Sequence, residues 1–197
     1  MKKRLDQQIN FLLEIDKLKS IIRRSYLLDE SRLENTAEHS WHVAVAALLL
    51  AEYAPEHVDA PRVIKMMLIH DIVEIDAGDT FLYDESANAE KVEREQRAAD
   101  RLFRLLPDDQ ATELRALWNE FEARTTPEAK FARGLDRLMP LMHNYYTQGA
   151  TWRKHDVTSD MVLKQNSIIA EASPTLWEFA QDIIGKAVNK GYLKSLT

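Results

Sequence analysis

Apolar residues recur at three- and four-residue spacing in one segment of this chain after another, which is the period of an α-helix. The pattern predicts helices over 5–22, from about Asn35 to just before Pro55, from Pro61 to Gly78, and over 89–106, 110–124, 127–148, 158–171 and 174–190. No segment shows the alternation of apolar and polar residues that marks a half-buried strand. The 197 residues include only five Gly and six Pro, about half of the usual share of roughly 12%. Because sheet-rich folds need these residues for tight turns, we expect an all-α fold, a helical bundle of about seven to nine helices.

Individual residues mark where several of these helices begin and end. Asn35 can cap the second helix, and Glu38, three residues later, would complete a capping box. Pro61 suits the first turn of the third helix. Gly78 suits the left-handed position that follows a helix. Pro140 lies inside the helix expected over 127–148 and predicts a kink there.

The length and charge of the chain limit its class. A chain of 197 residues is long enough for one well-packed domain and hardly for two, and no repeat or linker divides it, so we expect a single domain over residues 1–197. The net charge of −6 and the pI near 5.6 argue against binding to nucleic acid or to an anionic membrane. The absence of Cys excludes disulfides, thiolate catalysis and Cys-ligated zinc.

Neither a signal peptide nor a membrane span is predicted. The apolar stretch at residues 11–13 stops at Glu14, which is too short for the core of a signal peptide. The longest apolar run, residues 43–51, is well short of the roughly 20 residues that a membrane span needs. We therefore expect a cytoplasmic protein with no membrane partner.

The pair His70-Asp71 stands inside an apolar helix, in the string MMLIHDIVEI. Burying a carboxylate costs several kcal/mol unless it is paired or bound to a cation. One interpretation is a hydrogen-bonded core histidine, with Asp71 capping a neighbouring helix. The other interpretation is a metal site.

Three further residues favour the metal site. Glu74 lies four residues after His70 and three after Asp71, on the same helical face. His39 opens the preceding predicted helix, and Asp136 lies in a third apolar helix between Leu135 and Leu138. Brought together, His39, His70, Asp71 and Asp136 would form a set of two imidazoles and two carboxylates. Such a set suits Zn, Mn, Co, Fe or Ni better than Mg and leaves open positions on a five- or six-coordinate ion.

This H…HD…D pattern resembles the signature of the HD-domain metal-dependent phosphohydrolases. The strings ENTAEHS (34–40), LIHDIVEIDAGD (68–79) and LDRL (135–138) resemble the 5′-deoxynucleotidase branch of that family. The resemblance implies a metal-site core over about 18–145, with C-terminal helices over 150–197. It also implies one divalent transition metal held by His39, His70, Asp71 and Asp136, a nucleotide substrate and a homodimer.

The resemblance further implies roles for the residues around the metal. Glu74 would be the acid/base residue, and Asp79, with Thr80 beside it, would bind the sugar. A phosphate-orienting arginine would be Arg23, with Arg24 as the alternative. The family's deoxynucleotidase has Trp next to that arginine, whereas here Ser25 and Tyr26 follow Arg24.

Each of these residues also has a structural interpretation. Glu74 could be an exposed helix carboxylate, Asp79 with Thr80 could shape the turn after Gly78, and Arg23 could pair with one of the many acids. Glu38 is expected to cap its helix. His42 is expected to hydrogen-bond in the core or near the site, and the remaining histidines are expected to be structural or exposed: His57, His143 and His155.

The function expected from these residues is hydrolysis of (deoxy)nucleoside 5′-monophosphates at one metal ion. A two-metal site is disfavoured because no histidine lies between Asp71 and Asp136. A triphosphatase or another phosphoester hydrolase is the nearest alternative, although a polyphosphate would require more cations than Arg23 and Arg24. The third possibility, a non-catalytic module that binds nucleotide and metal, would have no need of Glu74.

Overall fold

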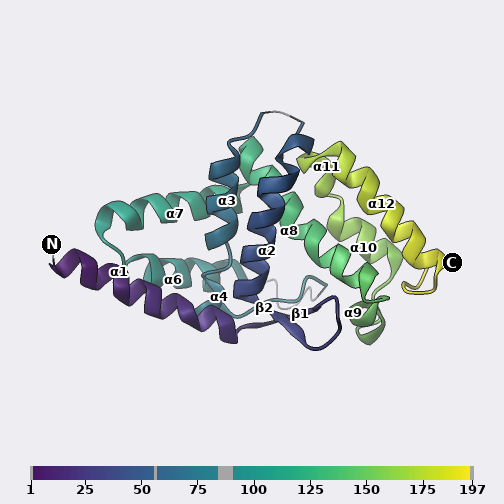
Figure 1. Ribbon diagram of the computed structural model, residues 1–197, viewed down its shortest axis with the longest axis horizontal. Helices are drawn as coiled ribbons and strands as arrows, with labels where there is room; N and C mark the ends of the chain where they lie inside the picture. The colour runs from purple at the N-terminus through teal and green to yellow at the C-terminus, as the bar shows by residue number, and fades with distance from the viewer. Residues whose placement is uncertain (1, 56, 84–90, 196–197) are drawn as a thin grey trace.

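The computed structural model describes residues 2–55, 57–83 and 91–195, and the predicted all-α class is confirmed (Figure 1). The helices are α1 (Lys2–Ile15), α2 (Thr36–Leu50), α3 (Ala60–Ile69), α4 (Glu74–Ala77), α6 (Lys91–Phe103), α7 (Asp108–Ala123), α8 (Pro127–Tyr146), α9 (Ala150–Lys154), α10 (Ser159–Asn166), α11 (Ile169–Ala172) and α12 (Pro174–Asn189). In the described part of the chain, no helix is long and apolar enough to cross a membrane.

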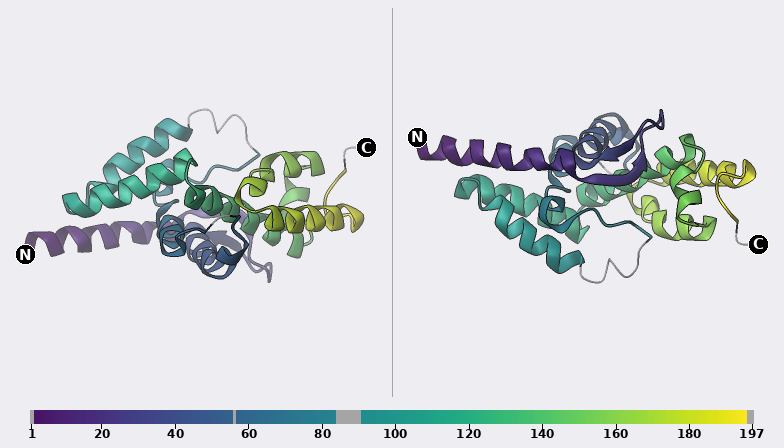
Figure 2. Two further views of the ribbon diagram at one scale, coloured as in Figure 1. Left: turned by 90° about the horizontal axis from the view of Figure 1, so that it is seen from above. Right: turned by 90° about the horizontal axis from the view of Figure 1, so that it is seen from below.

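The helices form an elongated body with the functional residues near its middle. Helices α2, α3 and α8 pack together at the centre, with α1, α6 and α7 toward one end and α10–α12 toward the other (Figures 1 and 2). The two termini lie at opposite ends of the long axis. The three central helices therefore meet where segments distant in sequence can supply residues to one site.

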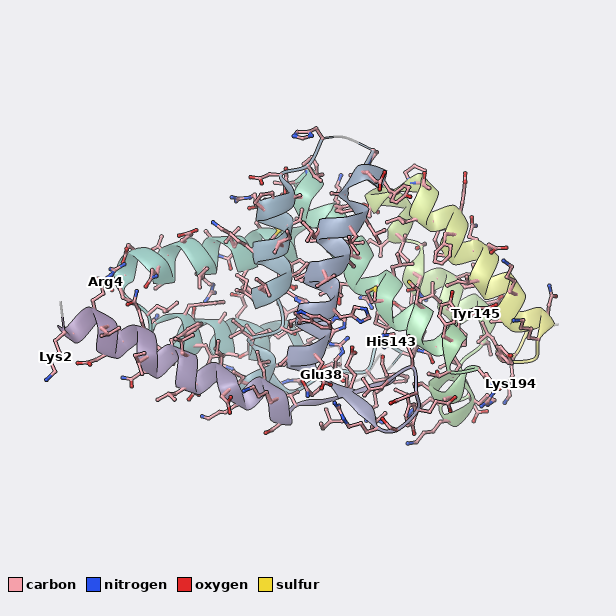
Figure 3. The ribbon with its side chains drawn as sticks, viewed as in Figure 1. Lys2, Arg4, Glu38, His143, Tyr145 and Lys194 are labelled. Atoms are coloured by element: carbon pink, nitrogen blue, oxygen red, sulfur yellow. The ribbon has the colours of Figure 1, made fainter. Side chains whose placement is uncertain are left out.

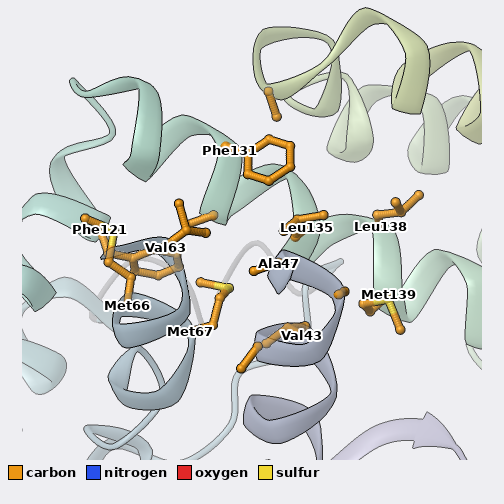
Figure 4. Close-up of a cluster of buried hydrophobic side chains, with 14 of the residues drawn as sticks. Val43, Ala47, Val63, Met66, Met67, Phe121, Phe131, Leu135, Leu138 and Met139 are labelled. Atoms are coloured by element: carbon orange, nitrogen blue, oxygen red, sulfur yellow. The ribbon is translucent and has the colours of Figure 1, made fainter. Parts of the chain in front are cut away.

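The centre is held by apolar side chains from each of the three helices (Figure 4). Val43 and Ala47 of α2, Val63 of α3 and Leu135 of α8 are completely buried. Each large side chain buried in this way contributes about 1.5–3 kcal/mol relative to an exposed one. The same cluster continues without interruption through the other buried apolar residues, so the site rests on a rigid support.

The predicted helix ends are largely confirmed. The Asn35 side chain accepts a hydrogen bond from the Glu38 amide, and the Glu38 carboxylate accepts one from the Asn35 amide, which completes the capping box. Pro61 lies in the first turn of α3, and Gly78 follows α4 with φ +75°. Pro140 lies inside α8, where it leaves the Asp136 carbonyl without its helical donor.

The helix predicted over 5–22 is wrong in its last third. Helix α1 ends at Ile15, a 3₁₀ turn covers Asp16–Ser20, and Ile22–Tyr26 forms strand β1. This strand pairs antiparallel with β2 (Leu33–Asn35), in the register Ile22 with Asn35 and Tyr26 with Leu33. Two strands of five and three residues are too short to show a period of two, and their pairing depends on a partner about ten residues away. The hairpin fixes the direction in which β1 presents Arg23 and Arg24.

The helix predicted from Pro61 to Gly78 is interrupted in the middle. Helix α3 ends at Ile69, and α4 begins at Glu74. Between them the amides of Ile72 and Glu74 bond to carbonyls three residues back, those of Ile69 and Asp71, which is the tighter 3₁₀ pattern. Residues three apart eclipse in such a turn, so Asp71 and Glu74 still face the same side.

The remaining differences are small. The range 158–171 divides into α10 and α11, and α9 was not predicted. The observed bounds of α7, α8 and α12 lie within two residues of the predicted ones. Residues 89 and 90 of the range 89–106 lie outside the described residues.

Candidate active site

Three of the four predicted metal ligands converge, although they come from three separate segments. One ligand atom each from His39, His70 and Asp136 lies within 4.8 Å of the other two, and the group is buried. Asp136 Oδ1 is 3.1 Å from His39 Nε2 and 3.5 Å from His70 Nε2. Two ligand atoms about 2.1 Å from one ion lie roughly 3.0–3.4 Å apart at octahedral or tetrahedral angles. The spacing of these atoms therefore fits a single ion.

The two imidazoles are already oriented for metal binding. His70 Nδ1 lies 2.8 Å from the Met67 carbonyl oxygen, a contact in which Nδ1 donates its proton and which leaves Nε2 as the nitrogen that can bind a metal. His70 Nε2 is buried and has no hydrogen-bond partner among the described residues. On His39, Nδ1 faces Glu34 Oε2 at 3.6 Å while Nε2 faces Asp136. A buried nitrogen without a partner is unfavourable, and a divalent cation bound between it and the neighbouring carboxylates would supply that partner.

Asp71, the fourth predicted ligand, lies at the edge of the group formed by His39, His70 and Asp136. Its Oδ2 lies 3.2 Å from His70 Nε2, 4.0 Å from His39 Nε2 and 3.0 Å from Arg23 Nη1. Burial opposes ionisation, but His70 and Arg23 hold the pKa of Asp71 well below its usual range. Burial also opposes the charge on His70, yet Asp71 and Asp136 raise its pKa to about 10. The centre therefore attracts positive charge strongly.

Glu74 lies beside this group and is not an exposed helix carboxylate. It is 5% exposed, and its Oε2 accepts a hydrogen bond of 2.9 Å from the Thr36 hydroxyl. Burial and the neighbouring Asp71 carboxylate raise the pKa of Glu74 well above its usual range, against the opposing charge of Arg23. A carboxyl group with a raised pKa can carry a proton near neutral pH, which suits an acid/base role.

Arg23, Asp79 and Thr80 line a pocket that opens over the centre. Asp71, Glu74 and Asp136 line the same pocket, so it brings the predicted substrate residues and the predicted metal ligands together. Arg23 Nη1 lies 3.7 Å from Asp79 Oδ1 and 4.0 Å from Glu74 Oε1, so it both pairs with acids and faces the site. Burial and Asp71 raise the pKa of Asp79, which Arg23 opposes. Arg24 also lines the pocket, with its guanidinium 5.7 Å from the Phe81 ring centre.

Several pocket residues were not predicted from the sequence. Phe81 and Tyr83 supply the aromatic surface that the chain lacks beside Arg23. Lys91, Arg133 and Arg137 add cations to the same pocket, which weakens the sequence-based argument that a polyphosphate would find too few. Arg133 and Arg137 lie one turn apart on α8, on either side of Asp136 in the sequence. This spacing could have predicted that both arginines lie near the site.

Glu34 was also missed, and it links the centre to a second histidine group. Its side chain is 2% exposed and lies 3.6 Å from both His39 Nδ1 and Arg23 Nε. On its other side, ligand atoms of Glu34, His42 and His143 lie within 4.8 Å of one another. His143 of α8 (Figure 3) is buried rather than exposed, and its ring centre is 5.5 Å from that of His42. His42 thus lies near the site, as expected.

The sequence profile of the HD domain family matches residues 15–177. The chain belongs to the HD-domain family. Among solved structures, this HD-domain protein superposes on a predicted metal-dependent phosphohydrolase from Magnetospirillum magnetotacticum MS-1 with a TM-score of 0.92 and 55% identity, over 98% of this chain and 99% of that one. A protein from Pyrococcus horikoshii OT3, at 20% identity and a TM-score of 0.66, shares the fold.

Two curated relatives of the HD-domain protein carry the name 5′-deoxynucleotidase HDDC2. The Bos taurus protein is 33% identical over 130 residues, which are 66% of this chain and 62% of that relative. The Xenopus laevis protein is 28% identical over 187 residues, which are 85% of this chain and 92% of that relative. The matched part of the chain thus spans less than two thirds of the bovine protein. The HD-domain family implies a divalent metal, which His39, His70 and Asp136, with Asp71 at their edge, are placed to hold.

Proposed function

We propose that this protein is a mononuclear, metal-dependent 5′-nucleotidase that hydrolyses (deoxy)nucleoside 5′-monophosphates to nucleoside and phosphate. The observation that carries the proposal is the meeting of Glu74, Asp79 and Arg23 in one pocket beside the ligand group of His39, His70 and Asp136. The names of the 5′-deoxynucleotidase relatives support the same reaction.

Each residue then has a role that its position allows. His39, His70, Asp71 and Asp136 would hold the metal ion, which when bound would supply Lewis acidity at the phosphate and lower the pKa of a water molecule. Thr36 holds Glu74 Oε2, which leaves Oε1 to take a proton from the attacking water or to deliver one to the leaving 5′-oxygen. Arg23 offsets the negative charge of the phosphate in the transition state. Asp79 accepts a hydrogen bond from the sugar, with Thr80 and Arg24 nearby.

A polyphosphate substrate is the second candidate, and one observation favours it. The pocket is lined by five cations: Arg23, Arg24, Lys91, Arg133 and Arg137. Two of them have acidic partners elsewhere, because Lys91 pairs with Glu95 and Arg133 with Glu122. Cations that are already paired are less available to bind additional phosphate groups. A nucleoside monophosphate therefore remains the first candidate substrate.

The test is phosphate release from a panel of dNMPs, NMPs and dNTPs by chelator-treated protein, with Mn, Co, Zn, Fe, Ni and Mg restored one at a time. We expect release from monophosphates with a transition metal, and less with Mg, because imidazole ligands suit transition metals. Release of pyrophosphate or triphosphate from dNTPs alone would replace the first proposal by the second. Bound metal with no release from any member would favour a binding module.

We also propose that the protein is a homodimer. Exposed large apolar side chains gather on α1, at Leu5, Ile9, Leu12 and Leu13, and on α2, where Trp41 is 64% exposed beside Leu48 and Leu49. On α1 the spacing of three and four residues makes the set a continuous face, and on α2 Trp41 and Leu48 lie two turns apart; such exposed apolar faces mark association sites. Light scattering should give twice the chain mass for the wild type. Leu12→Glu should lower it, whereas Asn10→Glu on the same helix should not.

We infer further that residues 1–197 form one domain in the cytoplasm. One contiguous hydrophobic cluster includes Phe11 of α1 and Ile184 of α12, which supports a single cooperative unfolding transition in calorimetry.

The cytoplasmic location follows from the proposed substrate, since nucleoside monophosphates are made and consumed inside the cell. Cell fractionation tests it.

A further inference from the structure

Arg137 lies next to Asp136 on α8 and lines the pocket over the metal ligands. Its Nε is buried and has no hydrogen-bond partner among the described residues. The other guanidiniums of the pocket are engaged. Arg23 holds Asp71 at 3.0 Å, Arg133 holds Glu122 at 2.8 Å, and Arg24 lies over Phe81. Within the described part of the chain, no carboxylate forms an ion pair with Arg137.

A buried guanidinium nitrogen without a hydrogen-bond partner, such as Arg137 Nε, is costly for the folded state. Burial lowers the pKa of Arg137 from its usual value; Asp136 partly offsets this, and the like charge of Arg133 adds to it. Arg has five N–H donors in a planar fork and stays protonated in proteins. Its cost therefore cannot be relieved by losing the proton, and an anion arriving in the pocket would relieve it.

The side chain shares the pocket with the metal ligands. Arg137 directly follows Asp136 on α8, and it lines the pocket together with Asp71, Asp136 and Tyr83. A guanidinium in this place can reach a group bound at the metal.

We propose that Arg137 binds the non-bridging oxygens of the phosphate group that the enzyme cleaves. The inference rests on the proposed function for the identity of the substrate, but the anion site itself can be tested without turnover. Arg137 would hold the phosphate through charge-assisted, two-pronged hydrogen bonds, while Arg23 stays tied to Asp71, Glu74 and Asp79. Arg23 and Arg133 also have a buried Nε without a hydrogen-bond partner, but both form ion pairs with carboxylates, whereas Arg137 forms none among the described residues.

The experiment measures inorganic phosphate binding to metal-loaded wild type, Arg137→Gln, Arg137→Lys and Arg97→Gln. Arg97 is an exposed arginine of α6 paired with Glu93, so its variant removes the same charge away from the pocket. We expect Arg137→Gln to weaken phosphate binding by about 10- to 100-fold. We expect Arg137→Lys to recover part of the loss and Arg97→Gln to bind like the wild type. Metal content is measured in every sample.

Thermal unfolding of the same proteins separates a binding role from a structural one. Removing an unpaired buried charge should leave Arg137→Gln at least as stable as the wild type, while phosphate binding falls. Weaker binding together with a large loss of stability would overturn the proposal and make Arg137 a structural residue. Unchanged phosphate binding would also overturn it.

A nucleoside 3′,5′-bisphosphate distinguishes the cleaved phosphate from a remote one. If Arg137→Gln weakened binding of the bisphosphate but not of inorganic phosphate, the arginine would hold a second phosphate, and the proposal would be wrong. If inorganic phosphate binding falls but the nucleotide panel shows no hydrolysis, the anion site stands and the proposed 5′-nucleotidase function fails.

Discussion

Two groups of two histidines and a carboxylate lie in this protein, and they differ in how their side chains are held. Helix α2 supplies His39 to the first and His42 to the second, and α8 supplies Asp136 and His143 respectively. In the first group, Asp136 Oδ1 lies 3.1 Å from His39 Nε2 and 3.5 Å from His70 Nε2. In the second, His143 Nδ1 is 4.0 Å from Glu34 Oε1, so this pair is more widely spaced than the two pairs that Asp136 makes.

The difference teaches that residue types do not define a metal site. Both groups are two histidines with a carboxylate, and both lie largely in the interior. What separates them is that His70 Nδ1 is fixed by a backbone carbonyl, whereas Glu34 is shared between His39, Arg23 and the second group. We therefore interpret the second group as support for the first.

The largest effect is expected when a ligand of the first group is removed. Asp136→Ala should lose the metal, and nucleotidase activity should fall on the order of 10³-fold or more because the Lewis acid is lost. Metal analysis and phosphate release measure the two losses. Asp100→Ala, on exposed α6, is the control and should keep both. Retention of full metal occupancy by Asp136→Ala would remove Asp136 from the ligand set.

Glu74→Gln should separate chemistry from metal binding in the first group. The variant keeps the shape of the side chain but cannot transfer a proton, so turnover should fall on the order of 10²-fold while metal content stays the same. Full activity would show that Glu74 is not the acid/base residue.

Glu34→Gln tests the connection between the two groups. The change removes the negative charge that faces His39 Nδ1, and such supporting carboxylates are worth about 10- to 100-fold in metal affinity. Competition with a metal-binding dye measures the affinity. An affinity equal to that of the wild type would mean that Glu34 does not orient His39.

The raised pKa of Glu74 predicts how the stability of chelator-treated protein depends on pH. A raised folded-state pKa means that the contribution of protonated Glu74 is present below its unfolded pKa and is lost as pH rises through the folded value. Glu74→Gln does not titrate, so its stability relative to that of the wild type should increase as pH rises. Denaturant unfolding at pH 4, 6 and 8 measures the difference, and a constant difference would contradict the shift.

The smallest effect is expected at the second group. His143→Gln should leave metal content and affinity within about twofold of the wild type. His143 faces Glu34, which in turn faces His39, so its effect on the metal site is indirect. If metal content instead fell from two ions per chain to one, the second group would be a metal site and the comparison would fail.

The convergence of His39, His70 and Asp136 was predictable because each is an ionisable residue next to apolar helix residues, where it needs a partner. Arg137 and Glu34 were not predictable. Arg137 looks like an ordinary helix cation beside Asp136, and its lack of a partner appears only when α8 is packed. Glu34 lies in a hairpin whose second strand is three residues long, so its approach to His39 depends on pairing that local periodicity does not reveal.

The interruption between α3 and α4 leaves the His70 carbonyl in contact with a tryptophan whose fluorescence can be measured. Trp118 Nε1 donates a hydrogen bond of 3.1 Å to the His70 carbonyl, and the indole is 1% exposed. Any shift of the His70 backbone changes the dipole that this indole faces, and with it the wavelength and yield of its fluorescence. A protein in which Trp41, Trp152 and Trp177 are replaced by Phe would report the arrival of an ion at His70 through a single emitter, without label or substrate.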